Sequence, residues 1–143
     1  MRTSIAFLIG ILLGSAIPAI MAQGPRLAGM DGVNHVGINV ENVDEARAFF
    51  TQKMGFTDAF TVRNAQGQPT LAYVQASRNT FVELQPADAN RTPGISHVGL
   101  QVEDIRATIA SLKQRGVTVE EARPSSTQSL IANVTGPGGV RIE

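Results

Sequence analysis

Four side chains of this sequence could together bind a divalent metal ion: His35, Glu83, His97 and Glu143. The two histidines are the only ones in the chain. Imidazole nitrogens and carboxylate oxygens suit Zn, Ni, Co, Mn or Fe(II), and four protein ligands leave one or two positions of an octahedral ion for water or substrate. The chain has no cysteine, which excludes thiolate metal sites, disulfides and a cysteine nucleophile. The residue types therefore predict a mixed histidine and glutamate metal site.

The two histidines stand at equivalent positions of an internal repeat. Residues 34–41 read NHVGINVE and residues 96–103 read SHVGLQVE, at an offset of 62. Glu83 and Glu143 follow nearly the same spacing, 60 residues apart. A single strand histidine is more often hydrogen-bonded inside a core, and a single glutamate is often only solvent-exposed. The symmetric set of two imidazoles and two carboxylates favours a shared site over these simpler interpretations.

Each repeat predicts a strand, a helix and three further strands. Apolar residues alternate along 33–40 and 95–102, which indicates strands that carry the histidines on the face opposite the apolar one. A helix follows each strand, with Asn42 and Asp104 as its N-caps. Turn residues separate the remaining strands, expected near 56–63, 70–76, 80–85, 117–120, 128–134 and 140–143. The predicted fold class is α+β, with two βαβββ modules.

Both glutamates occupy the last predicted strand of their module. Val82 and Leu84 flank Glu83 and are expected to face the core, so this glutamate points to the opposite face. Ile142 is expected to do the same for Glu143. Because Glu143 is the final residue of the sequence and chain ends fray, we expect it to be the least secure of the four ligands.

The first 22 residues are typical of a secretory signal peptide. Arg2 precedes a nearly all-apolar stretch, and Ala22 suits the position before a cleavage site. An uncleaved anchor is the alternative, but Pro18 makes this stretch a poor membrane span. We therefore expect a periplasmic or secreted protein. The expected organisation is a signal peptide (1–22), a flexible leader (23–32) and one domain (33–143) with modules 33–86 and 95–143.

Composition limits the partners that this chain could have. The formal net charge is zero, so nothing in the electrostatics favours nucleic acid or an anionic membrane. We expect a small-molecule substrate, no nucleic acid, and no membrane association after signal cleavage. Asn39, Gln101 and Arg141 share strand faces with the predicted ligands and are expected to line the substrate cleft, although an ordinary polar surface would look the same.

The sequence resembles the vicinal oxygen chelate (VOC) superfamily, which has the glyoxalase, bleomycin-resistance and extradiol dioxygenase fold. The resemblance covers about residues 33–143 and is carried by NHVGINVENVDEARAFF, FVELQP, SHVGLQVEDI and GPGGVRIE. It implies that each module forms half of a curved mixed sheet around a metal cleft, with His35, Glu83, His97 and Glu143 as the ligands. It also implies a homodimer, because single chains of this family often pair.

By the same resemblance, the protein is expected to be a glyoxalase I-like lyase or isomerase that acts on a small oxygenated substrate. The metal would chelate neighbouring oxygens and stabilise an enolate, while Glu83 or Glu143 moves a proton. The sequence does not choose between these two glutamates. An extradiol-type dioxygenase, using His35, His97 and Glu143, is the alternative, but no spare histidine is present for its acid–base step. A non-catalytic periplasmic module that binds a metal or small ligand also fits. Export argues against glutathione, which is mainly cytosolic, as cosubstrate.

Overall fold

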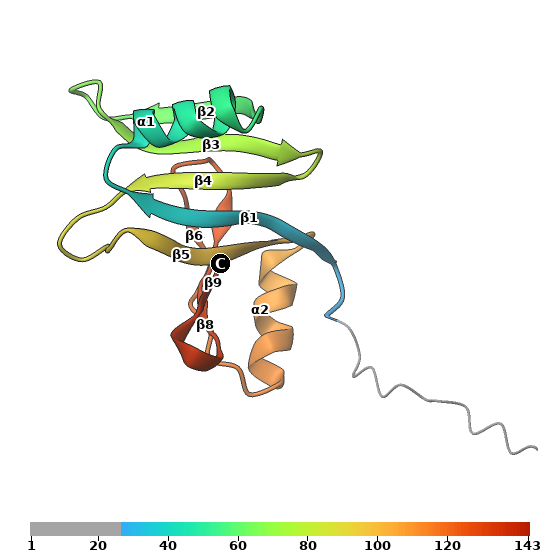
Figure 1. Ribbon diagram of the computed structural model, residues 1–143. Coiled ribbons are helices and arrows are strands. Elements are labelled where there is room, and N and C mark those ends of the chain that lie inside the picture. The colour runs from blue at the N-terminus through green and yellow to red at the C-terminus, as the bar shows by residue number, and fades with distance from the viewer. Residues whose placement is uncertain (1–26) are drawn as a thin grey trace, which may run out of the picture.

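The computed structural model describes residues 27–143 of the chain (Figure 1). The expected signal peptide and the first part of the expected leader lie outside the described residues. The first strand, β1 (Met30–Val40), begins before residue 33, because the backbone N–H of Glu103 donates to Gly29 O at 2.9 Å and holds the start of this strand beside its neighbour. No helix in the described part of the chain is long and apolar enough to cross a membrane.

The first module follows its predicted order closely. After β1 come α1 (Val43–Ala48), a π-helical turn (Phe49–Lys53), β2 (Thr57–Arg63), β3 (Pro69–Ser77) and β4 (Thr80–Pro86). Asn42 caps the first helix by accepting a hydrogen bond from the Glu45 backbone N–H at 3.1 Å, as its side chain predicts. Gly55, with a φ of 75°, allows the sharp turn into β2 that a residue with a Cβ would resist.

The second module also begins with a long strand and a helix, but four two-residue strands follow the helix where three longer ones are predicted. It contains β5 (Gly94–Val102), α2 (Ile105–Gln114), β6 (Arg123–Pro124), β7 (Leu130–Ile131), β8 (Val134–Thr135), a 3₁₀ turn (Pro137–Gly139) and β9 (Arg141–Ile142). The strand expected near 117–120 is only a single bridge between Val119 and Val134. The strand expected near 128–134 is divided into β7 and β8, and it starts late because Gln128 has a φ of 64° and the hydroxyls around it bond locally.

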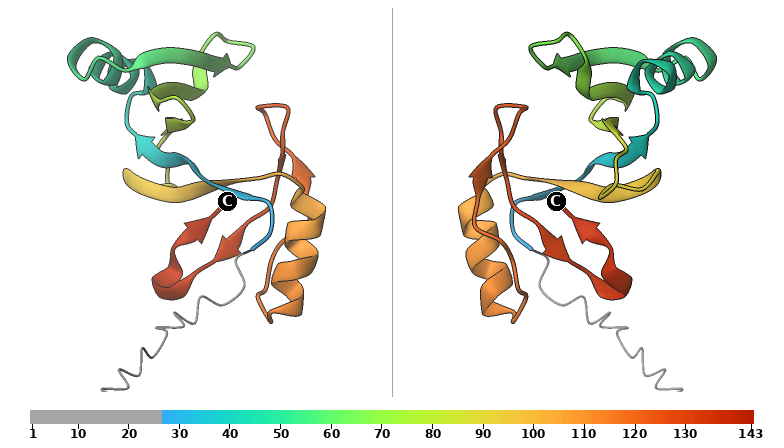
Figure 2. Two further views of the ribbon diagram at one scale, coloured as in Figure 1. Left: turned by 90° about the vertical axis from the view of Figure 1, so that its right-hand side faces the viewer. Right: turned by 90° about the vertical axis from the view of Figure 1, so that its left-hand side faces the viewer.

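The two modules share one seven-stranded sheet with the order β2-β3-β4-β1-β5-β9-β8. The first strands of the two repeats, β1 and β5, lie antiparallel at its centre, while β4 is parallel to β1 and β9 is parallel to β5. The fold is therefore the mixed sheet of paired modules that the sequence predicts. The β6–β7 hairpin leaves the sheet and lies on the side of β3 and β4 away from α1 (Figure 2).

The two faces of the first module are packed in different ways. Helix α1 covers one face, where Val43, Ala72 and Leu84 form a buried apolar cluster. The opposite face carries buried polar side chains instead, among them His35 and Glu83. Burying such groups is unfavourable unless they are paired or bind a ligand. A binding site is therefore expected on this face.

Candidate metal centre

The register of β1 and β5 brings the two predicted histidines together. His35 lies opposite Gly99, and His97 lies opposite Gly37, so each imidazole ring lies over the glycine of the other strand. A Cβ added to Gly37 would lie 2.1 Å from the His97 ring, and one added to Gly99 would lie 2.0 Å from the His35 ring. Only glycine leaves room for the rings, so the repeated His-Val-Gly is a geometric requirement of this crossing.

The four predicted ligands form one cluster, with one donor atom from each within 4.8 Å of the others. His35 Nε2 lies 3.0 Å from His97 Nε2, 3.3 Å from Glu83 Oε2 and 3.7 Å from Glu143 Oε1. With metal–ligand bonds of about 2.1 Å, two donors on one ion are separated by about 3 to 4 Å. The cluster therefore has the donor types and the spacing to hold one divalent ion, and all four donors come from one chain.

Neighbouring side chains orient the two imidazoles. His35 Nδ1 lies 2.9 Å from Asn34 Oδ1, an atom that can only accept, so Nδ1 carries the proton and the Nε2 lone pair faces the cluster. His97 Nδ1 has Ser96 Oγ at 2.8 Å and Arg141 Nη2 at 2.6 Å. A hydrogen bond donated by the outer ring nitrogen is the usual support of a metal-bound histidine, and Asn34 and Ser96 can accept it. The Arg141 guanidinium has no lone pair and cannot.

Glu83 is the most firmly held of the four candidate ligands. The Tyr73 hydroxyl donates a hydrogen bond to one of its carboxylate oxygens, and the Gln85 amide donates to the other. Tyr73 itself is fixed by stacking on Phe60, with ring centroids 4.9 Å apart, and burial raises the pKa of its phenol so that it stays protonated. The sequence prediction did not include Tyr73. Its signal was available, because it is the only tyrosine of the chain and a buried phenol normally finds a polar partner.

Burial sets the protonation of the histidines. It lowers the pKa of His35 below the ordinary value, and it lowers the pKa of His97 to about 4, with the positive charge of Arg141 acting in the same direction. Both rings are therefore neutral at pH 7. Metal ligation requires an unprotonated ring nitrogen, so neither histidine has to be discharged before an ion binds.

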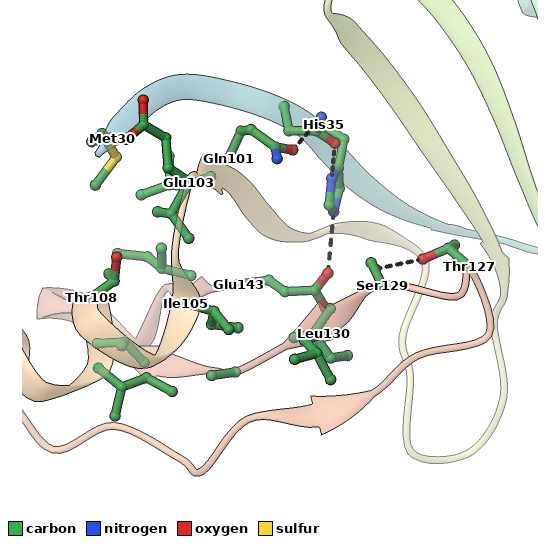
Figure 3. Close-up of a pocket in the computed structure, with 18 of the residues that line it drawn as sticks. Met30, His35, Gln101, Glu103, Ile105, Thr108, Thr127, Ser129, Leu130 and Glu143 are labelled. Atoms are coloured by element: carbon green, nitrogen blue, oxygen red, sulfur yellow. Dashed lines mark hydrogen bonds and ion pairs between the residues drawn. The ribbon is translucent and has the colours of Figure 1, made fainter. Parts of the chain in front are cut away.

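Glu143 is anchored through its backbone and free at its side chain. Its N–H donates to Val98 O at 2.9 Å and its carbonyl accepts from Leu100 N–H at 2.8 Å, so this final residue is held along β5. No hydrogen bond within the described residues reaches its carboxylate, and its nearest polar contact is His35 (Figure 3). Burial and the nearby negative charge of Glu83 raise the pKa of this carboxyl.

Two cavities meet at the cluster. The larger, of about 680 Å³, is mainly apolar, and its wall includes Phe60, Tyr73 and Phe81. Ile105 and Leu130 line it as well (Figure 3). The smaller, of about 230 Å³, is polar and lies between β3–β4 and the β6–β7 hairpin, with a wall that includes Arg123, Ser125, Ser126, Thr127 and Arg141. Glu143 lines both cavities, so it stands where a molecule in either one would meet the cluster.

The three residues predicted to line a substrate cleft are placed differently from one another. Arg141 lines the smaller cavity and touches His97. Gln101 lines the larger cavity but is exposed and accepts a hydrogen bond from Asn34. Asn39 is outside both cavities, and its buried amide donates to Thr92 O at 3.1 Å.

Comparison with known proteins gives a consistent match over the described domain. Residues 32–143 match the family described as the Glyoxalase/Bleomycin resistance protein/Dioxygenase superfamily. A probable lactoylglutathione lyase of Vibrio cholerae is 30% identical over 118 residues, which cover 76% of this chain and 86% of that protein. Its counterpart in Vibrio parahaemolyticus is 29% identical with the same coverage. Methylmalonyl-CoA epimerase from Mycobacterium tuberculosis has a similar structure, with a TM-score of 0.65 at 25% identity, covering 80% of this chain and 86% of that one.

Proposed function

Since this chain belongs to the glyoxalase/bleomycin resistance protein/dioxygenase superfamily, we propose that it is a metal-dependent lyase or isomerase of the glyoxalase I-like kind, acting on a small oxygenated substrate. The observation that carries this proposal is the cluster of buried His35, Glu83 and His97 with half-buried Glu143, in which the histidine Nε2 atoms lie 3.0 Å apart. The name of the Vibrio cholerae relative supports the reaction class.

The bound ion would act as a Lewis acid that stabilises negative charge on substrate oxygens. His35, His97 and Glu83 would hold it, because all three are buried and supported by neighbouring hydrogen bonds. Glu83 is poorly suited to move a proton, since both of its oxygens already accept hydrogen bonds from Tyr73 and Gln85.

Glu143 is the better candidate for the general base. Its carboxylate receives no hydrogen bond from the described residues, and it borders both cavities. Its raised pKa brings it nearer to neutral pH, where a carboxylate abstracts and returns protons more effectively. We therefore assign proton transfer next to the substrate carbonyl to Glu143 and the holding role to Glu83.

The dioxygenase alternative is less well supported by the geometry. That reaction uses a face of two histidines and one carboxylate with open positions for substrate and oxygen. Here Glu83 lies 3.3 Å from His35 and is locked by Tyr73, so it occupies a fourth place in the cluster. A non-catalytic metal-binding module would have the same cluster, and only turnover separates it from an enzyme.

The first test is metal content followed by turnover. We expect one Ni, Co or Zn ion per chain by mass spectrometry, and isomerisation of methylglyoxal–thiol adducts, with glutathione among several thiols tried. Glu143→Gln keeps an oxygen donor, so we expect it to retain most metal and lose at least about 100-fold in turnover. Glu83→Gln makes the same substitution at the glutamate assigned to hold the ion, and it should lower metal affinity more than Glu143→Gln does. Failure to bind any ion in Ni, Co or Zn titrations would refute the proposal, and bound metal without turnover on any adduct would leave a binding module.

We also propose that the protein is exported and works as a homodimer. Export rests on the signal-like residues 1–22, and peptide sequencing of the mature N-terminus would test it. The dimer is supported by exposed apolar side chains outside the cluster, such as Phe49, Met54 and Ile95. Light scattering after size-exclusion chromatography tests the dimer, and a monomer at micromolar concentration would refute it.

A further inference from the structure

Two arginines face the smaller cavity without a carboxylate partner. Arg141 comes from β9 and Arg123 from β6, and neither forms an ion pair within 4.0 Å among the described residues. Other arginines of the domain do pair, as Arg47 does with Asp58 and Arg63 with Asp44. Glu83 and Glu143 line the same cavity, and both arginines lower the pKa of Glu143 from a distance. The two guanidinium groups are therefore left without a direct ion pair.

Arg141 has unused hydrogen-bonding capacity inside the protein. Within residues 27–143 its buried Nε has no partner, and its one hydrogen bond goes from Nη2 to His97 Nδ1 at 2.6 Å. A buried donor without an acceptor is costly, and a guanidinium presents paired donors that match a carboxylate. Because Nε is closed to solvent, an acceptor in the smaller cavity would meet the outer nitrogens of this guanidinium, which form one hydrogen bond among the described residues.

The contact between Arg141 and His97 is also a poor support for a metal ligand. A histidine bound through Nε2 normally donates from Nδ1 to an acceptor, and a guanidinium has no lone pair to accept with. Ser96 Oγ, 2.8 Å from the same nitrogen, can take that role. Orienting His97 is therefore a task for Ser96, which leaves Arg141 available for a ligand.

The charges around the cluster point to the same kind of ligand. Glu83 and Glu143 together carry two negative charges, which one divalent ion would neutralise. Arg123 and Arg141 then remain as uncompensated positive charge beside a cavity of about 230 Å³ with hydroxyl groups on Ser125, Ser126 and Thr127. This volume accommodates a carboxylate with a short carbon segment, while the apolar remainder of a substrate would fit the larger cavity of about 680 Å³.

We propose that Arg141, assisted by Arg123, binds a carboxylate group of the substrate in the smaller cavity. This inference rests on the proposed function and narrows it: the substrate is an oxygenated carboxylic acid whose apolar part faces Phe60, Tyr73 and Phe81. In this arrangement Arg141 holds the acid group, and Glu143, which lines both cavities, would act on the carbon between the acid group and the apolar part.

The test compares phenylglyoxylate with its neutral amide, which has the same shape and the same neighbouring oxygens but no charge. Binding is measured by calorimetry in the full domain, metal-free and loaded with Co(II), and by the Co(II) absorption spectrum. We expect the acid to be preferred in both forms, and more strongly in the Co(II) form, where the ion neutralises Glu83 and Glu143. In the Co(II) form, Arg141→Gln should weaken acid binding by about 10- to 100-fold and leave amide binding unchanged, because a charge-assisted hydrogen bond is lost. Arg141→Lys should recover part of the loss.

Two further variants provide matched controls. Arg123→Gln should weaken acid binding only about two- to fivefold, because this arginine is exposed. Arg78→Gln removes the same charge from the distant turn between β3 and β4 and should have no effect. An acid preference that falls equally in all three variants would show a nonspecific charge effect and refute the proposal.

Co(II) affinity separates a substrate-binding role from a structural one. If Arg141 binds substrate, Arg141→Gln leaves Co(II) affinity unchanged or raises it, since a positive charge beside the ion is removed. If Arg141 instead positions His97, its loss should lower Co(II) affinity by about 10- to 100-fold, and the proposal is wrong. Equal binding of acid and amide by the wild-type Co(II) form would also overturn it. Absence of any metal binding would count against the proposed function alone, because the acid preference of the metal-free protein still tests Arg141.

Discussion

The methyl group introduced by Gly99→Ala tests whether the strand crossing creates the metal centre. The new Cβ would lie 2.0 Å from His35 Cε1 and 2.5 Å from its Nε2. Nonbonded carbons normally stay about 3.5 Å apart, so the imidazole would have to move by about 1.5 Å. Metal–ligand bonds tolerate only about 0.2 Å, and His35 is therefore lost as a ligand. We expect metal affinity to fall at least about 100-fold, or about 2.7 kcal/mol.

Two measurements follow the consequence of this substitution. Competition titration with a chelator reports Zn or Co affinity, and denaturant unfolding of the metal-free protein reports overpacking, expected to cost about 1–3 kcal/mol. The unfolding penalty of Gly99→Ala should disappear in a His35→Ala background, because the methyl group clashes with that ring. Gly136→Ala is the matched control: its φ is −83° and the nearest atom to its new Cβ is the flexible end of Ile142, 3.3 Å away. If Gly99→Ala bound metal like the wild type, the crossing of β1 and β5 would not be what creates the metal centre.

Three further outcomes are expected. Tyr73→Phe removes the donor to Glu83 but keeps the ring, so metal affinity should fall about 10-fold with little change in unfolding; an unchanged titration would show that the hydroxyl does not support Glu83. Below pH 6.5 the unfolded chain protonates His97 while the folded chain resists until about pH 4, so metal-free stability should drop across this window by up to about 3 kcal/mol. The raised pKa of Glu143 offsets part of this drop, and a flat pH profile of denaturant midpoints would contradict the expectation. Asp104→Ala removes the N-cap of α2 and should lower the free energy of unfolding by about 1 kcal/mol. Metal affinity should not change, and calorimetry of unfolding and of metal titration on the same samples would check both outcomes.

The first module could be predicted well because its strands follow a simple rule. Apolar and polar residues alternate along β1, and β3 and β4 are rich in aliphatic side chains, so both the strands and the side of Glu83 follow from the sequence. The second module departs from prediction where local hydrogen bonds compete with the sheet. Ser125 and Ser129 bond to each other through both backbone and side chain, and β7 shrinks to two residues.

The sequence predicts which residues form the candidate site, but it does not predict which glutamate holds the ion and which one moves a proton. The repeat identifies the two histidines, and it also contained an unused signal, since the glycine two positions after each histidine is where the other ring must lie. That Glu83 is immobilised while Glu143 is free depends on Tyr73, which reaches Glu83 across paired strands. The sequence predicts these two strands and a polar partner for a buried tyrosine, but it does not show that the hydroxyl meets this carboxylate. The same holds for Arg141, whose unpaired Nε is visible only in three dimensions.

The antiparallel pairing of β1 with β5 has a consequence for how a duplicated protein becomes an asymmetric one. Equivalent residues are related by a local twofold rotation, because Val36 pairs with Val98 while each histidine faces the other strand's glycine. The inner donors obey this symmetry, but the residues behind them do not: Asn34 supports one imidazole, whereas Ser96 and Arg141 lie behind the other. Two identical copies could only build a site with interchangeable halves. Because the residues around the four donors differ between the repeats, one repeat can specialise in holding the ion and the other in proton transfer. Substitutions at these outer positions would then change the reactivity of the centre while its four donor residues stay the same.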